Sequence, residues 1–183
     1  MPTAESKPRP IDPWHLQRAL MLASGQHLPD RPEINKGVLL YAALTLEELA
    51  ETMAALTAAL DKVEGGAQLH RVAQMLGQTA KTMQESSKVI RSELETVPAG
   101  FAIFPNDEDL VELADGTTDV AVVNAGFALS LGLDGSRCYA EVGVSNLSKA
   151  NPDTGVIDKT ADGKWIKGRD YKAPNLARVV LGK

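Results

Sequence analysis

One stretch of this sequence restricts the fold more than any other because its apolar residues recur at a fixed interval. Every seventh residue from 69 to 97 is large and apolar, and a second column of small or apolar residues accompanies it. The two columns are Leu69, Leu76, Met83, Ile90 and Val97, and Ala73, Ala80, Ser87 and Leu94. A seven-residue repeat forms a narrow stripe along a helix, and such a stripe packs against a second helix. Packing within the chain and contact with a second subunit both satisfy this pattern, and our hypothesis is a subunit contact.

The rest of the chain also favours helices. Of its 183 residues, 44% are hydrophobic but only 4% are aromatic, and its abundant alanine and leucine residues are strong helix formers. We therefore expect an all-α helical bundle that ends in a short C-terminal hairpin or an extended tail. The expected helices cover residues 12–25, 33–62, 67–97, 107–131 and 136–150, and the expected hairpin strands cover 155–158 and 164–167. In the last helix we expect Tyr139, Val142 and Leu147 to face inward.

Composition also limits where the chain acts and what it binds. Prolines at positions 2, 8 and 10 predict a flexible arm over residues 1–11, followed by one helical domain over residues 12–183. The single cysteine, Cys138, excludes an internal disulfide, and the lack of a signal peptide predicts a cytoplasmic protein. No apolar run reaches the ~18 residues needed to cross a membrane. The formal net charge of -5 argues against a general nucleic-acid-binding surface.

Two groups of acidic residues lie inside apolar helical patterns. The groups are Glu47, Glu48 and Glu51, and Glu112, Asp115 and Asp119. Spacings of three and four residues place acids of each group on a shared helix face, and the surrounding leucine, methionine and valine residues predict that both helices are substantially buried. Buried carboxylates need a counter-charge, and few basic residues lie nearby in the sequence. A hard divalent cation held between the two helices would satisfy them, whereas a solvated helix face is the alternative interpretation.

These acids resemble the paired motifs of a known family. Residues 47–51 match EExxE and residues 112–115 match ExxD, the motifs of the all-α nucleoside triphosphate pyrophosphohydrolases, or MazG-like superfamily. The resemblance implies a catalytic domain that uses magnesium or manganese to polarise phosphate oxygens and activate water. The implied metal ligands are Glu48, Glu51, Glu112 and Asp115, and the implied catalytic residues are Glu47 and Glu48. Glu47 would accept a proton from water or bind a further ion, and Asp119 is a weaker candidate for either task.

The spacing of the two motifs departs from the family pattern. In most members ExxD follows EExxE closely, whereas 60 residues (112 − 51 − 1) separate them in this sequence. We interpret residues 63–106 as an insertion for which we can place no family counterpart.

The C-terminal part resembles one branch of this family, which includes phage enzymes of the MazZ type. The matching segments are residues 141–149, 162–168 and 171–174. This resemblance implies hydrolysis of dGTP or GTP to the monophosphate and pyrophosphate, in the host cytoplasm if the chain is phage-encoded. The implied substrate-binding residues are Asn146 and Lys149 near a helix end, and Lys164 and Lys167 in a basic tail. A basic pair often precedes the Ser-Asn of this branch, but Gly143 and Val144 stand there in this chain.

Other interpretations remain open at the level of the sequence. The chain is alternatively a pyrophosphohydrolase of dUTP or of several deoxynucleotides, or a non-catalytic helical assembly module whose acidic faces are solvated. Lys149 also suits the negative end of a helix dipole without any ligand. The family resemblance implies active sites completed by a second subunit, and therefore a homodimer or a homotetramer built from dimers.

Overall fold

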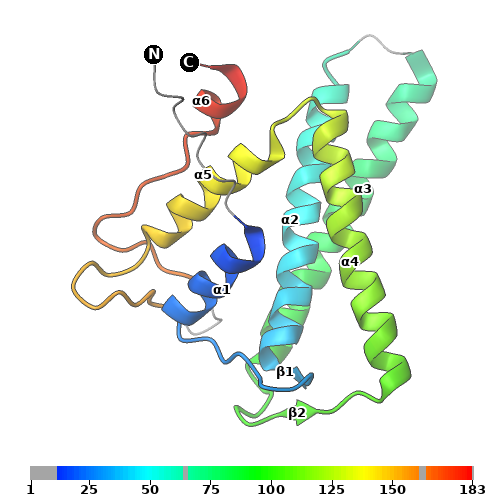
Figure 1. Cartoon of the computed structure of the whole chain (residues 1–183). Helices are drawn as coiled ribbons and strands as arrows, with labels where there is room; N and C mark the ends of the chain where they lie inside the picture. The colour runs from blue at the N-terminus through cyan, green and yellow to red at the C-terminus, as the bar shows by residue number, and fades with distance from the viewer. Residues whose placement is uncertain (1–11, 64–65, 161–163, 183) are drawn as a thin grey trace, which may run out of the picture. The chain divides into compact units, whose positions relative to one another are not determined.

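A computed structural model describes residues 12–63, 66–160 and 164–182 as two compact units (Figure 1). The hairpin unit contains the described residues of Arg31–Phe104, and the tail unit contains those of Met1–Asp30, Pro105–Thr160 and Lys164–Lys183. The described residues are mostly helical, which confirms the predicted fold class. The expected arm over residues 1–11 lies outside the described residues, and the single domain over residues 12–183 stays a prediction.

Two long helices, α2 (Lys36–Leu60) and α3 (Gly66–Leu94), lie side by side in the hairpin unit (Figure 1). A two-stranded sheet joins their far ends, because β1 (Ile34–Asn35) pairs with β2 (Ala102–Ile103) in antiparallel register. Asn35 also caps α2, since its side chain accepts hydrogen bonds from the backbone N–H groups of residues 37 and 38. Such a cap satisfies donors that the first helical turn leaves unpaired. This sheet was not predicted from the sequence, and the helix corresponding to α2 was expected to begin at residue 33 rather than at Lys36.

The seven-residue columns form the seam between α2 and α3. The buried residues of α3 are Ala73, Ala80, Ser87 and Leu94, which make up the second column, and the large residues of the first column are half-buried. The buried residues of α2, Ala43 and Ala50, are also seven positions apart. Small side chains on both helices allow their axes to approach closely. The seam is thus covered within the chain, so the hypothesis that these columns form a subunit contact was wrong. The homodimer or homotetramer that the family resemblance implies stays a prediction.

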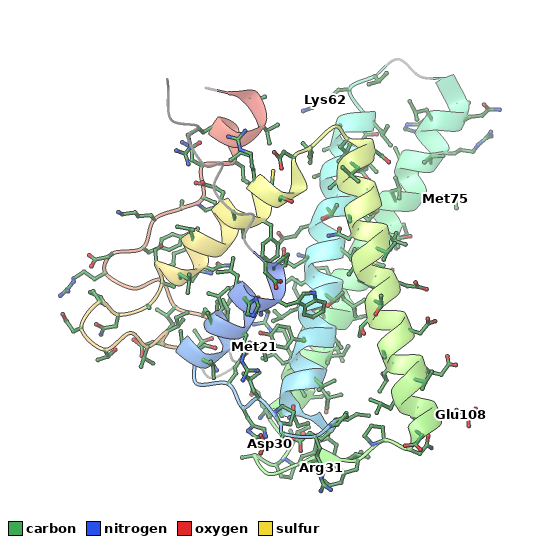
Figure 2. The ribbon with its side chains drawn as sticks, in the orientation of Figure 1. Met21, Asp30, Arg31, Lys62, Met75 and Glu108 are labelled. Atoms are coloured by element: carbon green, nitrogen blue, oxygen red, sulfur yellow. The ribbon has the colours of Figure 1, made fainter. Side chains whose placement is uncertain are left out.

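Arg31 marks the end of the hairpin unit at which the chain enters it. Its guanidinium group lies 3.7 Å from the centre of the Phe104 ring, and Figure 2 labels Arg31. An arginine above an aromatic face gains a cation–π attraction. This contact lies at the same end as the β1–β2 pair, so it adds a second link between the two ends of the hairpin.

In the tail unit, α1 (Pro13–Ala23) packs against α5 (Gly135–Leu147). Asp12 caps α1 by accepting a hydrogen bond from the Trp14 N–H at 2.9 Å. The core of the unit consists of Leu16, Leu20 and Ile157, with Trp165 packed against it. The core is therefore formed by α1 and the segment after α5.

The faces of α5 differ from those we expected. Tyr139, Val142 and Leu147 are exposed, whereas Gly143 and Ser145 are buried. The reason is close packing, because the side chain of Leu16 occupies the space that a Cβ at position 143 would need. The prediction that the three larger residues face inward was therefore wrong.

The chain after α5 forms the expected short hairpin and then a helix that we did not predict. Lys159 and Trp165 form an antiparallel bridge, and the Ile166 N–H donates to the Asp158 carbonyl at 2.8 Å. The helix that follows, α6 (Leu176–Leu181), is capped by Asn175. Six residues carry too little periodic signal to be found from sequence.

The remaining helix of the tail unit, α4 (Asp107–Ser130), contains no buried residue. Its N-cap is Asn106, as expected, and acidic residues fill its first turn, among them Glu108, which Figure 2 labels. Several valines are largely exposed, including Val123 at 71%. The prediction that this helix is substantially buried was wrong, because an apolar pattern does not specify what covers it.

Among the described residues, no single helix is long and apolar enough to cross a membrane, although α4 and α5 together meet that criterion as a pair bent by 112°.

Candidate metal and substrate site

The three acids of the EExxE motif point in different directions around α2. Each residue of a helix turns the chain by about 100°, so Glu47 lies about 60° from the direction of buried Ala50, Glu51 about 100° and Glu48 about 160°. Burial agrees with this order, because Glu47 is half-buried whereas Glu48 and Glu51 are exposed. Glu47 therefore faces the border with α3. Glu51 lies at the edge of that border, where it lines a hollow between the two helices, and Glu48 lies on the side turned away from it.

Glu47 forms an ion pair with Arg91 of α3. The Arg91 Nη1 donates to the Glu47 Oε2 at 2.9 Å, and the two side chains are only 13% and 22% exposed. This counter-charge lies 44 positions away in the sequence. The expectation that the first acid cluster lacks a basic neighbour therefore does not hold for Glu47.

Glu51 borders a hollow between α2 and α3 within the hairpin unit. The hollow has a volume of about 280 Å³, and its floor is formed by small residues such as Ala54 and Ala80. Its polar lining comes from Glu51, Asp61, Lys81 and Gln84. A carboxylate at the rim of an open hollow is accessible to a cation or a solvated ligand.

The acids of the second motif lie on α4. Glu112, Asp115 and Asp119 are all exposed, and their spacing places them along one side of the helix. A shallow hollow of about 320 Å³ lies over Glu112 and Gly116. No atom lies within 4 Å of the position that a Cβ at Gly116 would take, so this face of α4 is open.

The two motifs fit a divalent cation in their chemistry, and each unit contains two of the four predicted ligands. Glu48 and Glu51 come from the hairpin unit, and Glu112 and Asp115 from the tail unit. All four are exposed carboxylates, which are the oxygen ligands that magnesium and manganese prefer. Within the described part of the chain, no group of three histidine, cysteine, aspartate or glutamate side chains is close enough to hold an ion. The convergence of the two pairs stays a prediction.

Residues 145–149, with the sequence Ser-Asn-Leu-Ser-Lys, hold the backbone at Lys172 against α5. The Ser145 hydroxyl donates to the Lys172 carbonyl at 2.8 Å, and the Ser148 hydroxyl accepts from the Lys172 N–H at 2.8 Å. Both serines are thus used in holding the backbone of residue 172. Asn146 and Lys149 of the same segment are half-buried, and their contact with a substrate stays a prediction.

The lysines implied as substrate contacts lie beside aromatic rings of the tail. The Lys149 Nζ is 5.5 Å from the centre of the Trp165 ring, and the Lys167 Nζ is 4.8 Å from that of Tyr171. Lys164 is exposed. The matched residues Asp162 and Gly163, which come directly before it, lie outside the described residues. Lys149, Lys164 and Lys167 therefore all belong to the tail unit, as their positions in the sequence suggested.

Glu141, which was not predicted to have a role, holds α6 against α5. Its Oε1 accepts from the Asn175 N–H at 2.8 Å, and its Oε2 accepts from the Arg178 Nη2 at 3.0 Å. The hydrogen bond from Asn175, followed by the hydrogen bond and charge of Arg178, lowers the pKa of Glu141 below its usual value. Glu141 therefore fixes the start of α6 on α5, and no local sequence signal links residues so far apart.

Comparison with known proteins supports the fold. No family model matches the sequence, and no curated protein matches it. The structure resembles that of a "putative NTP pyrophosphohydrolase" from Exiguobacterium sp. 255-15, with a TM-score of 0.58 over 92% of each chain and 17% sequence identity. The two proteins share an all-α fold. At this identity, the likeness concerns the fold and not the identity of the substrate.

Proposed function

We propose that this chain is a metal-dependent hydrolase that converts a nucleoside or deoxynucleoside triphosphate to the monophosphate and pyrophosphate. The observation that carries the proposal is that the chain shares its fold with a protein described as a "putative NTP pyrophosphohydrolase" while containing sequences that match both acidic motifs of that class. Each motif lies on a long helix and presents exposed carboxylates. A solvated assembly module has no need for either motif.

The cation sites are assigned to Glu48, Glu51, Glu112 and Asp115. When bound there, magnesium or manganese would neutralise phosphate charge and lower the pKa of a bound water. The four carboxylates supply negative charge and oxygen ligands, and they leave room for phosphate oxygens because none is buried. Asp119, one turn further along α4, is available to a second ion.

Glu47 is assigned to proton transfer. Arg91 contacts its Oε2, so Oε1 is the oxygen that can accept a proton from the attacking water. Glu48 is next to it in the chain and contributes both to catalysis and to metal binding.

The substrate that we propose is dGTP or GTP, on the basis of the resemblance of residues 141–149, 162–168 and 171–174 to MazZ-type enzymes. Asn146 and Lys149 would contact sugar or phosphate from α5. Lys164 and Lys167 would contact phosphate from the tail, since a lysine ammonium is a compact charge suited to phosphate oxygens.

A homodimer or a tetramer of dimers is part of this proposal. The exposed valines of α4 support it, because contiguous apolar surface on a soluble helix is commonly covered by another chain. Analytical ultracentrifugation over a wide concentration range tests this part separately. A monomer at all concentrations would contradict it.

The proposed activity is tested by pyrophosphate release from a panel of GTP, dGTP, dATP, dCTP, TTP and dUTP, with magnesium, manganese or a chelator. We expect metal-dependent release that is fastest with dGTP or GTP. Glu48→Gln and Asp115→Asn should each reduce turnover to background while the helical circular-dichroism signal is retained. Glu85→Gln, at an exposed position of α3, is the matched control and should retain full activity.

Two results would contradict the proposal. Full activity in Glu48→Gln or Asp115→Asn would remove the metal-site assignment, and the lack of release from every triphosphate would remove the enzymatic function. Faster hydrolysis of dUTP, or equal hydrolysis of several deoxynucleotides, would contradict only the guanine preference.

A further inference from the structure

The pair between Arg91 and Glu47 joins the long helix α3 to the EExxE motif at a half-buried point. The seam between α2 and α3 otherwise consists mainly of alanine and other small or apolar side chains. Arg91 crosses this seam, and its Nη1 lies 2.9 Å from the Glu47 Oε2. It is an ion pair that connects α2 with α3.

Burial makes this pair more informative than a surface salt bridge. Exposed ion pairs contribute little and tolerate many geometries. Here both side chains are mostly covered, and a carboxylate left in such a place without its partner is unfavourable. The guanidinium group therefore restricts the orientation of the Glu47 carboxylate, because rotation away from Arg91 would break a partly buried charged hydrogen bond.

We propose that Arg91 is a positioning residue for the EExxE motif, acting through Glu47. It fixes the Glu47 carboxylate through Oε2, which leaves Oε1 as the oxygen that accepts a proton from water. This assigns a role to α3, the main element of the segment 63–106. The inference rests on the proposed function, because it concerns how a catalytic carboxylate is oriented.

The pair also accounts for the division of the motif into two kinds of carboxylate. Glu47 is turned about 100° from Glu48 around the helix axis, toward the border with α3. A carboxylate that is already paired with an arginine is a weaker ligand for a cation than an exposed one. Arg91 thereby leaves metal binding to Glu48 and Glu51.

The test compares Arg91→Gln, Arg91→Lys, Glu47→Gln and the double variant Arg91→Gln/Glu47→Gln with the wild-type chain. Arg71→Gln, which removes an exposed arginine from the same helix, is the matched control. The measurements are kcat and KM for the triphosphate that the wild type hydrolyses fastest, and the affinity for Mn²⁺ from electron paramagnetic resonance. Circular dichroism defines a temperature at which every variant is folded, and Arg91→Lys serves if the Gln variant does not fold.

We expect Arg91→Gln to lower kcat by about 10- to 100-fold, as expected for a misplaced catalytic group, with KM changed by no more than about twofold, since substrate binding is retained. Arg91→Lys should recover part of kcat because it keeps the charge. The double variant should be no slower than Glu47→Gln alone, and Mn²⁺ affinity should be unchanged in Arg91→Gln. A purely structural role would not produce this dependence on Glu47.

The inference and the proposed function fail in different ways. An active wild type in which Arg91→Gln has no effect, or in which the two substitutions lower kcat multiplicatively, would overturn the positioning role alone. A rise in KM with kcat unchanged would also overturn it, because Arg91 would then contact substrate directly. A wild type that releases no pyrophosphate from any triphosphate would overturn the proposed function and this inference with it.

Discussion

Leu16 of α1 packs directly onto Gly143 of α5, in the space where any other residue would carry its Cβ. A Cβ at position 143 would overlap the Leu16 side chain, which is itself only 8% exposed. Since Leu16 belongs to the core of the tail unit, the contact fixes how closely α1 and α5 approach. Position 143 therefore requires a residue without a side chain.

Gly143→Ala should destabilise the protein despite alanine being the better helix former. Adding a methyl group to a filled core typically costs about 1–3 kcal/mol, which outweighs the gain of up to about 1 kcal/mol from replacing glycine in a helix. Urea denaturation followed by circular dichroism measures the difference. Combining Gly143→Ala with Leu16→Ala should remove the overlap, so a cost of Gly143→Ala that is equally large in the Leu16→Ala background would contradict the packing explanation.

Gly116→Ala is the matched control on α4 and should have the opposite sign. Nothing lies within 4 Å of the Cβ position at Gly116, so only the helix-propensity gain of up to about 1 kcal/mol applies. The same denaturation experiment measures it. A marked loss of stability would show that this open face of α4 is covered in solution.

The attachment of α6 should depend on pH through Glu141. The pKa of Glu141 is lowered in the folded chain by the hydrogen bond from the Asn175 N–H and by Arg178. A carboxyl group with a lowered pKa stabilises the fold above its unfolded pKa of about 4.3, and this contribution is lost as the pH falls through the lower, folded value. We therefore expect α6 to loosen at acid pH, visible as an NMR shift of the Asn175 amide.

Glu141→Gln provides the control for this titration. Glutamine keeps an acceptor for the Asn175 N–H but cannot titrate, so the Asn175 amide shift should lose its pH dependence in this range. An unchanged titration in Glu141→Gln would show that another group is responsible.

Lys149 should affect substrate binding more than turnover. If its ammonium group contacts phosphate or sugar, Lys149→Gln should raise KM about tenfold, the effect of losing about 1.4 kcal/mol of binding, with kcat little changed. Steady-state kinetics with the preferred triphosphate measure both. Lys88→Gln, at an exposed site on α3, is the control. If KM is unchanged while thermal stability falls, Lys149 serves only to cover Trp165.

The sequence was sufficient to locate the five longest helices, because apolar periodicity and capping residues are local signals. Asp12, Asn106 and the seven-residue columns each predicted an element that the structure contains. The two-residue strands β1 and β2 and the six-residue helix α6 carry too few residues for a period to show. The sequence also did not show that α2 is the helix that packs against α3, although Ala43 and Ala50 of α2 are seven positions apart.

The candidate site was predictable only where it consists of short motifs. Spacing placed Glu48 and Glu51 near one another on α2, and Glu112 and Asp115 on α4, since three or four residues make one helical turn. Arg91 and Glu141 were not identified because their partners lie 44 and 34 or more positions away. Contacts between residues so distant depend on how helices pack, which local pattern does not encode.

The small residues between α2 and α3 should be intolerant of enlargement. Ala50 is 3% exposed and Ala80 5%, and both lie in the seam where the helices pack closely. Ala50→Leu should therefore cost about 1–3 kcal/mol, because the added carbons force the helices apart or into strained rotamers. Ala59→Leu, at an exposed position of the same helix, makes the same chemical change and should alter the free energy of unfolding by no more than about 0.5 kcal/mol. Urea denaturation of both variants measures the difference, and equal stabilities would show that α2 and α3 do not form this close seam in solution.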